Sequence, residues 1–136
     1  MIFGTATGCV GSKNAPGRWQ AGAVLIYKLL AVAEWEAARA VGEFRGSAVD
    51  EADGYIHFST GEQVVETAVR YFADAEDLAM LTIDAERLGD GLRWEPSRGG
   101  DLFPHLYGPL PVEAVVAEVN LPSGVPVDRA VAEALG

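Results

Sequence analysis

The two histidines of the chain, His57 and His105, lie in short segments rich in polar and aromatic residues, which read YIHFST and FPHLYG. Histidine titrates near neutral pH and can act as an acid, a base or a donor to phosphate. On a strand, alternate side chains share a face, so we expect Tyr55, His57 and Ser59 to project together. The alternative is that His57 is a surface residue of a strand and that His105 satisfies a backbone carbonyl in a turn.

A predicted helix follows Ser59 and Thr60, and the TGEQ sequence that begins at Thr60 has the form of a capping box. Free backbone amides and the dipole at a helix start favour an anion. These two residues are therefore candidates for binding an anionic ligand. The structural alternative is that they only cap the helix.

A second candidate anion site is the SRGGD loop that begins at Ser97. Its two adjacent glycines can present backbone amides as a nest, and Arg98 can bind phosphate or carboxylate through two hydrogen bonds. The alternative is a turn in which Arg98 pairs with Asp101 or Glu95. No Walker or dinucleotide-binding spacing occurs in the chain.

Two other chemistries find less support in the spacing of residues. A zinc site built on both histidines needs a third ligand from Glu95, Asp53 or Asp101, and no HExxH or paired-cysteine motif is present. A serine hydrolase of the nucleophile-elbow type needs a GxSxG motif, which is also missing. We therefore expect no metal. The one cysteine rules out an intrachain disulfide, which fits a reducing cytosol.

The net charge of the chain bears on which kinds of partner it can bind. Twenty acidic and ten basic residues give a net charge of −10. Binding to nucleic acid polymers and to anionic membranes depends on clustered basic residues, so neither partner is expected. No apolar run is long enough to span a bilayer and no signal-peptide pattern opens the chain, which predicts a cytoplasmic location. A small phosphorylated ligand held by one or two arginines remains the expected partner.

The elements that must position these residues follow from the apolar pattern. Residues 1–23 are rich in glycine without a persistent period and are interpreted as a poorly ordered N-terminal extension, with a single α+β domain over 24–136. Expected strands are 24–30, 55–58, 78–83, 92–95, 103–107 and 113–121, and expected helices are 34–41 and 60–72. Residues 43–53 are expected to form a polar connection.

Four segments in order, at residues 26–29, 53–60, 94–100 and 103–110, resemble the signature of a family of small bacterial proteins called domain of unknown function 952. The order of elements is also similar, more distantly, to RNA 2′-phosphotransferases of the ADP-ribosyltransferase fold. This resemblance implies an α+β fold with a mixed, mostly antiparallel split β-sheet, two main helices and a cleft for NAD or an ADP-ribosylated intermediate.

The resemblance suggests an enzyme, or a former enzyme, that acts on NAD, ADP-ribose or a related small phosphorylated ligand, in the manner of a glycosyl or phosphoryl transferase. The alternatives are a non-catalytic sensor of a small anion and an interaction domain. The candidate catalytic residues are His57, His105 and Glu95. The candidate ligand-binding residues are Tyr27, Lys28, Ser59, Thr60, Ser97, Arg98, Gly99, Gly100 and Tyr107. We expect His57, Ser59, Arg98 and His105 to converge on one cleft.

Overall fold

The structure, a computed structural model, describes residues 24–136. The interpretation of residues 1–23 as an extension lies outside this part of the chain. The strands are β1 (Leu25–Ala31), β2 (Glu43–Phe44), β3 (Ile56–His57), β4 (Leu78–Asp84), β5 (Leu92–Pro96), β6 (Leu102–Leu106), β7 (Leu110–Pro111) and β8 (Val115–Asn120). The helices are α1 (Val32–Val41), α2 (Ala48–Asp53), α3 (Val64–Tyr71) and α4 (Val127–Leu135), with 3₁₀ turns η1 (Ala85–Gly91), η2 (Arg98–Gly100) and η3 (Val112–Ala114). The expected α+β class is confirmed, and the sheets are antiparallel.

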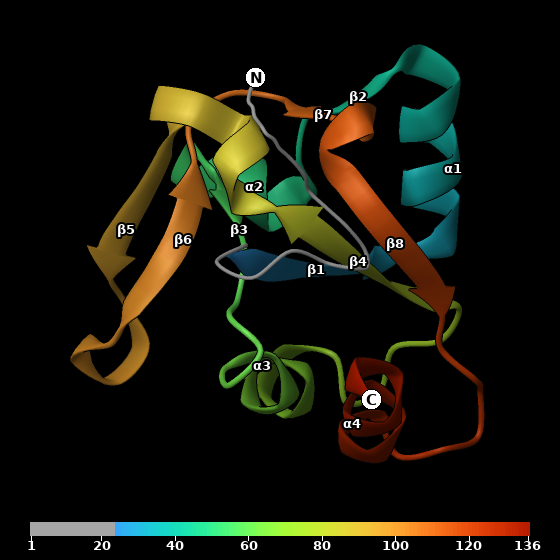
Figure 1. The fold of residues 1–136 in the computed structure, drawn as a ribbon. Coiled ribbons are helices and arrows are strands. Elements are labelled where there is room, and N and C mark those ends of the chain that lie inside the picture. The colour runs from blue at the N-terminus through green and yellow to red at the C-terminus, as the bar shows by residue number, and fades with distance from the viewer. Residues whose placement is uncertain (1–23) are drawn as a thin grey trace.

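Strand β4 is the centre of the main sheet, whose order is β1-β4-β8 (Figure 1). Its side chains alternate between two hydrophobic cores, because successive residues of a strand point to opposite faces. Leu81 and Ile83 join the core under α1, whereas Leu78 and Met80 join the core under α3 and α4. The prediction of a buried central strand at 78–83 is therefore confirmed.

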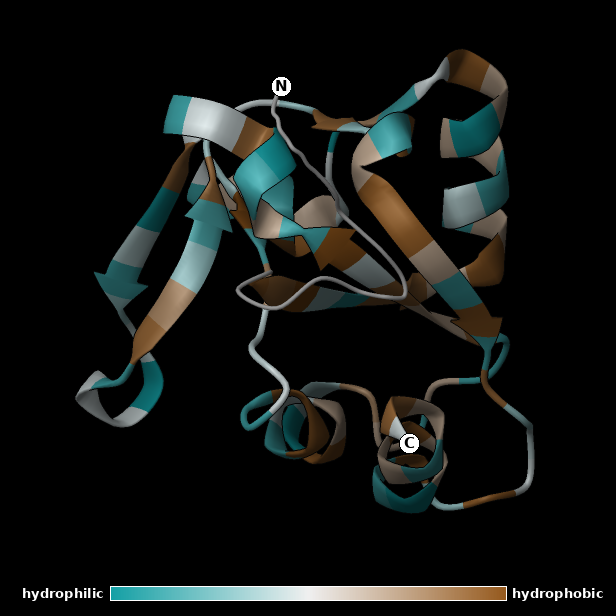
Figure 2. Ribbon diagram, viewed as in Figure 1, coloured by the Kyte–Doolittle hydropathy of each residue, from teal (hydrophilic) through white to brown (hydrophobic). Residues whose placement is uncertain are grey.

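The helices cover the two faces of this sheet. Trp35 and Ala38 of α1 lie in the first core, at the helical spacing of three residues. Ala68 and Val131 are fully buried in the second core, where α3 and α4 lie side by side (Figure 1). Figure 2 shows hydrophilic and hydrophobic residues alternating along α1 and α4, as expected of helices with one buried face. None of the helices in residues 24–136 is long and apolar enough to cross a membrane.

A second sheet, of order β3-β6-β5, is joined to the main sheet by an isolated antiparallel bridge between Tyr27 and Ser59. The amide of Tyr27 donates to the carbonyl of Ser59 at 2.7 Å, and the amide of Ser59 donates to the carbonyl of Tyr27 at 2.9 Å. This bridge sets the start of β1 beside the end of the β3 segment. It brings the two predicted sheet segments at 24–30 and 55–58 together.

Residues 43–53 differ from the expected polar connection, because they contain β2 and the short helix α2. Ser47 and Asp50 form a reciprocal capping box at the start of α2, and Gly54 ends the helix in the left-handed region, at φ 89°. Such a cap satisfies backbone amides that a coil would leave to solvent. The expectation of two main helices also missed α4.

Two apolar residues of the helices lie outside the cores. Val41 and Tyr71 fall at the same helical spacing as the buried residues of α1 and α3 but are 75% and 68% exposed. Each is the last residue of its helix. The helix expected from residue 60 begins instead at Val64.

Candidate functional site

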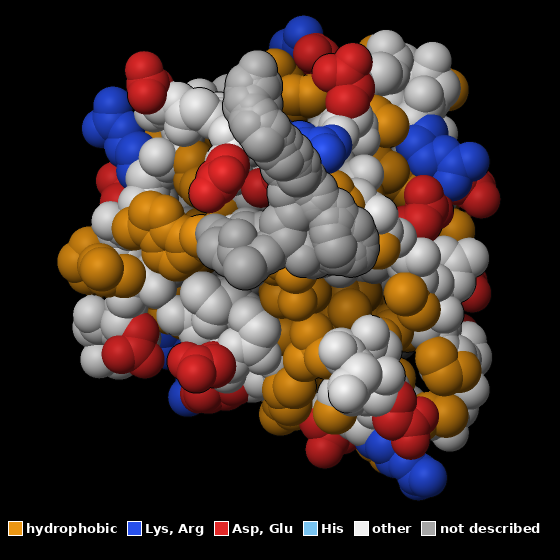
Figure 3. Space-filling model, in the orientation of Figure 1, with side chains coloured by type: hydrophobic (Ala, Val, Ile, Leu, Met, Phe, Trp, Pro, Cys, Tyr) orange, Lys and Arg blue, Asp and Glu red, His pale blue; other side chains and the backbone are white. Residues whose placement is uncertain are grey.

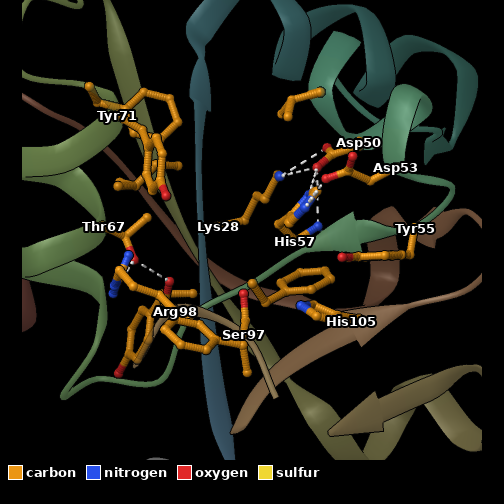
Figure 4. Close-up of a pocket in the computed structure, with 17 residues that line it drawn as sticks. Lys28, Asp50, Asp53, Tyr55, His57, Thr67, Tyr71, Ser97, Arg98 and His105 are labelled. Carbon is orange, nitrogen blue, oxygen red and sulfur yellow. Dashed lines mark hydrogen bonds and ion pairs between the residues drawn. The ribbon is translucent and has the colours of Figure 1, made fainter. Parts of the chain in front are cut away.

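A pocket of about 510 Å³ opens where β1, α2, β3, α3, η2 and β6 meet (Figure 4). Its titratable lining side chains are Lys28, Asp50, Asp53, His57, Arg98 and His105, and its hydroxyl groups come from Tyr27, Tyr55, Ser59, Thr67, Tyr71 and Ser97. Leu29, Val49, Phe58, Phe72 and Phe103 complete the wall. A mostly apolar pocket with convergent polar groups is typical of a small-molecule site.

The structure brings most of the candidate residues to this pocket. Tyr27, Lys28, His57, Ser59, Ser97, Arg98 and His105 line it. Thr60, Glu95, Gly99, Gly100 and Tyr107 do not. His57 and His105 face each other across the β3–β6 ladder, with ring centroids 5.6 Å apart.

Asp50 links three of the elements around the pocket, although it is only 2% exposed. Its carboxylate accepts from Lys28 Nζ at 2.9 and 3.1 Å, from the Ser47 amide at 2.9 Å and from the His57 amide at 3.1 Å. The Asp50 Oδ1 also lies 2.6 Å from Nδ1 of His57. Burial alone would raise the pKa of Asp50, but the His57 hydrogen bond and the Lys28 charge hold that pKa well below its usual range.

Lys28 reaches Asp50 from β1 and is 6% exposed. Burial lowers the pKa of Lys28, because an ammonium loses its hydration inside the protein, and the carboxylate of Asp50 opposes this shift. The pair therefore neutralises itself at one wall of the pocket. The Lys28 side chain is thus part of the pocket wall, and its positive charge is balanced by Asp50.

His57 lies between two carboxylates. Its Nδ1 faces Asp50 at 2.6 Å, and its Nε2 faces Asp53 Oδ2 at 2.9 Å. A carboxylate therefore faces each nitrogen of the His57 ring, which fixes the orientation of the imidazole. The His57 side chain is 32% exposed, which leaves it accessible from the pocket.

His105 has a different environment, because it is oriented by one carboxylate only. Its Nδ1 lies 2.8 Å from Glu95 Oε1, which also accepts from the hydroxyl of Tyr107 at 2.8 Å. The hydrogen bond from His105 lowers the pKa of Glu95, and the bond to Glu95 raises the pKa of Tyr107. The Tyr55 ring stacks on His105 at a centroid distance of 4.1 Å.

Arg98 forms the opposite end of the pocket, together with Thr67 (Figure 4). Its guanidinium lies 4.9 Å from the centre of the Phe103 ring, within the range of a cation–π contact. Its polar contacts are long, 3.4 Å to the Thr67 hydroxyl and 3.6 Å to Glu66. The acidic neighbour of Arg98 is therefore Glu66 on α3. The turn alternative had expected Asp101 or Glu95 in this place.

The two predicted amide sites for an anion are not present as expected. The Ser59 amide is used in the bridge to β1, and the Thr60 amide donates to the Gln63 side chain at 3.0 Å. The Gly100 amide donates to the carbonyl of Ser97 at 2.9 Å, within the η2 turn. These amides therefore already donate to acceptors within the protein. The candidate anion-binding group in the pocket is the Arg98 side chain.

The sequence interpretation did not single out Asp50 or Thr67 as site residues. Asp50 carried a usable signal, because Ser47 and Asp50 have the spacing of a capping box. Thr67 carried none, since a threonine inside a helix gives no hint of which residue will pack against it. Among residues 24–136, no group of three or more His, Cys, Asp or Glu side chains is arranged to hold a metal ion.

Comparison with known proteins identifies a family match and two similar solved structures. The family model described as "Protein of unknown function (DUF952)" matches residues 29–118. The crystal structure of protein CC0527 from Caulobacter crescentus is 53% identical, with a TM-score of 0.73 over 79% of this chain and 98% of that chain. Its solution NMR structure is 55% identical, with a TM-score of 0.66 over 75% of this chain and 90% of that chain. The comparison with curated proteins gave no match. As the four signature segments predicted, the chain belongs to the DUF952 family of proteins of unknown function.

Proposed function

We propose that the pocket binds a small phosphorylated ligand that carries a sugar, such as NAD, ADP-ribose or a related nucleotide. The observation that carries this proposal is that one pocket has two chemically different ends. Arg98 and Thr67 form a cationic, hydroxyl-rich end, whereas His57, Asp50 and Asp53 form an end of carboxylates and imidazole. A ligand with a phosphate and a ring of hydroxyl groups fits both ends.

The Arg98 end suits a phosphate because its guanidinium is held but not saturated. Contacts of 3.4 and 3.6 Å are longer than good charge-assisted hydrogen bonds, so a ligand oxygen can replace them at low cost. The side chain is 17% exposed and lines the pocket, so it is mostly packed against the protein and still borders the space a ligand would fill. The hydroxyl groups of Thr67 and Ser97 add donors beside it.

The other end suits sugar hydroxyl groups. Asp53 is 46% exposed and presents a carboxylate at the rim, beside the His57 ring. In dinucleotide-binding proteins an acidic side chain recognises ribose hydroxyl groups in the same chemical way. The aromatic rings of Phe103, which lies against Arg98, and of Tyr55, which stacks on His105, also line the pocket and provide flat apolar surface for a base or a sugar face.

The ligand class is the one implied by the ADP-ribosyltransferase resemblance, but the role of Glu95 differs from the one that resemblance implies. Glu95, the candidate for the catalytic glutamate, lies behind His105 and does not line the pocket. A glutamate that acts directly on the ligand therefore has no support, and binding is the function that the geometry favours. We propose an ADP-ribosyltransferase-like fold and transferase activity separately, on the order of elements along the chain.

The ligand is expected to be a metabolite and not a polynucleotide. The net charge of −10 repels a long polyanion, whereas a metabolite brings few charges that one arginine can balance. Figure 3 shows the Lys and Arg side chains of one face scattered among acidic ones, without a basic stripe.

A thermal-shift screen with NAD, ADP-ribose, nicotinamide and inorganic phosphate tests this function. A ligand that binds only the folded state stabilises it by about 2.7 kcal/mol at one hundred times its Kd. We expect NAD or ADP-ribose to raise the midpoint of unfolding by several degrees, and nicotinamide alone to raise it less. If none of the phosphorylated compounds shifts the midpoint at millimolar concentration, the proposed function is wrong.

A further inference from the structure

We propose that the pocket recognises a ribonucleoside 5′-phosphate group, with the phosphate on Arg98, the base stacked on Tyr71 and the ribose hydroxyl groups facing Asp53. This inference rests on the proposed function, because it requires that a phosphorylated sugar binds in the pocket. It goes further by naming the part of the ligand that is recognised and by making Tyr71 a residue that determines specificity.

Tyr71 is an aromatic side chain of the pocket that the fold leaves exposed. It is the last residue of α3, it is 68% exposed, and it lines the pocket. Among residues 24–136, every other tyrosine or phenylalanine of the pocket lining is buried or half-buried, and Tyr71 belongs to neither hydrophobic core. The Tyr71 ring can therefore take a flat partner without disturbing either core.

The two other rings considered for a base already have partners. The Arg98 guanidinium lies 4.9 Å from the centre of the Phe103 ring, and the Tyr55 ring stacks on His105 at 4.1 Å. Between residues of the described part of the chain, no aromatic stack or cation–π contact involves Tyr71. A base gains most on a ring whose face is open, which favours Tyr71 as the stacking position.

The phosphate-binding end of the pocket lies one helical turn from Tyr71. Thr67, whose hydroxyl accepts from Nη2 of Arg98 at 3.4 Å, precedes Tyr71 by four residues, so both side chains share one face of α3. Figure 4 shows Thr67 and Tyr71 on one side of the pocket and Asp50 and Asp53 on the other. Four residues of an α-helix rise by about 6 Å. One ribose ring separates the 5′-phosphate of a nucleotide from its base over a comparable distance.

The stereochemistry of ribose matches these two walls. In a β-ribonucleotide the base and the 5′-phosphate project from one face of the sugar ring, and the 2′ and 3′ hydroxyl groups project from the other. With the base and the phosphate on the α3 side, both hydroxyl groups face the side of Asp53. The Asp53 side chain is 46% exposed and its Oδ2 lies 2.9 Å from Nε2 of His57. A carboxylate has about four acceptor positions, so Asp53 can also accept from the ribose.

The charges of the pocket lining fit a single phosphate group at the Arg98 end. Lys28, the other strongly basic residue of the lining, is paired with Asp50. Arg98 has only a long contact of 3.6 Å with Glu66, whose carboxylate already accepts from Arg70 at 2.8 Å. One guanidinium is thus left to bind the phosphate that links ribose to the rest of the ligand.

Calorimetric titration of adenosine 5′-monophosphate and ribose 5-phosphate, which differ in the base at C1′, tests the role of Tyr71 on the full chain. We expect the wild type to bind the nucleotide at least about 5-fold more tightly, the lower end of what a base–aromatic stack contributes. Tyr71→Ala should remove this preference and leave the affinity for ribose 5-phosphate unchanged, whereas Tyr71→Phe should retain it. Val69→Ala, which shortens another exposed side chain of α3 outside the pocket lining, is the matched control and should bind both ligands as the wild type does.

Arabinosyladenine 5′-monophosphate, which carries its 2′ hydroxyl on the opposite face of the sugar, tests the orientation of the ribose. We expect the wild type to bind it more weakly than adenosine 5′-monophosphate, and Asp53→Asn to reduce that difference. Equal affinities of the wild type for the members of either ligand pair overturn the inference and leave the proposed function standing, as does a folded Tyr71→Ala that keeps the preference for the base. Binding of ADP-ribose without binding of adenosine 5′-monophosphate also overturns the inference alone. If none of these phosphorylated compounds binds, the proposed function is overturned with it.

Discussion

Lys28 and Asp50 form an ion pair that is buried on both sides, with side chains 6% and 1% exposed and a distance of 2.9 Å between Nζ and Oδ2. The pair joins β1 to α2 across 22 positions of sequence. The same carboxylate holds the backbone and the ring of His57. The geometry of the pocket therefore depends on one buried acid that lies outside the recognisable histidine segments.

Asp50→Asn is expected to lower the free energy of unfolding by about 3–5 kcal/mol, because it leaves the ammonium of Lys28 buried without a counter-charge. Urea denaturation followed by circular dichroism measures this change. Glu51→Gln, the exposed neighbour on the same helix, is the control and should change stability by less than about 0.5 kcal/mol. Equal losses for the two variants would contradict the role of the pair.

The same pair predicts how stability depends on pH. The pKa of Asp50 is lower in the folded state than in the unfolded chain, so its contribution is complete above the unfolded value of about 3.9. Below that value the unfolded state binds the proton first, and the contribution is lost as the pH falls toward the folded pKa. We expect the urea midpoint of the wild type to fall more steeply between about pH 4 and pH 2 than that of Asp50→Asn. Parallel curves for the two proteins would contradict this prediction.

Gly54 ends α2 with φ 89° and directs the chain into Tyr55, so its backbone conformation matters for the pocket wall. Gly54→Ala is expected to cost about 1–2 kcal/mol, because a Cβ is disfavoured in the left-handed region. Gly61→Ala is the matched control, since a Cβ there meets only ordinary contact with Tyr27 at 3.5 Å and no positive φ. Urea denaturation of both variants checks the prediction, and a larger loss for Gly61→Ala would show it to be wrong.

The elements with a strong period were predictable from the sequence, and those fixed by tertiary contacts were not. The apolar run at 78–83 predicted β4, and alternation in the YIHFST segment predicted which side chains share a face. The helix α2 was missed because its sequence is polar and its single buried residue, Asp50, is an acid. Burial of an acid depends on the partners Lys28 and His57, which only the folded chain brings together.

The candidate site shows the same division. Residue type and segment composition indicated His57, His105 and Arg98, which line one pocket. The amides of Thr60 and Gly100 were assigned to a ligand because the sequence does not reveal local hydrogen bonds. In the structure both amides donate to acceptors within their own turns.

Calorimetric titration of ADP-ribose into the wild type and two arginine variants tests most directly whether the pocket binds a phosphorylated ligand through Arg98. Arg98→Ala should weaken binding at least about 10-fold, since a charge-assisted hydrogen bond contributes about 1.5–3 kcal/mol. Arg129→Ala, which removes an exposed arginine of α4, should bind as the wild type does. Binding of ADP-ribose by a folded Arg98→Ala with wild-type affinity, or no binding by the wild type, would contradict the proposal.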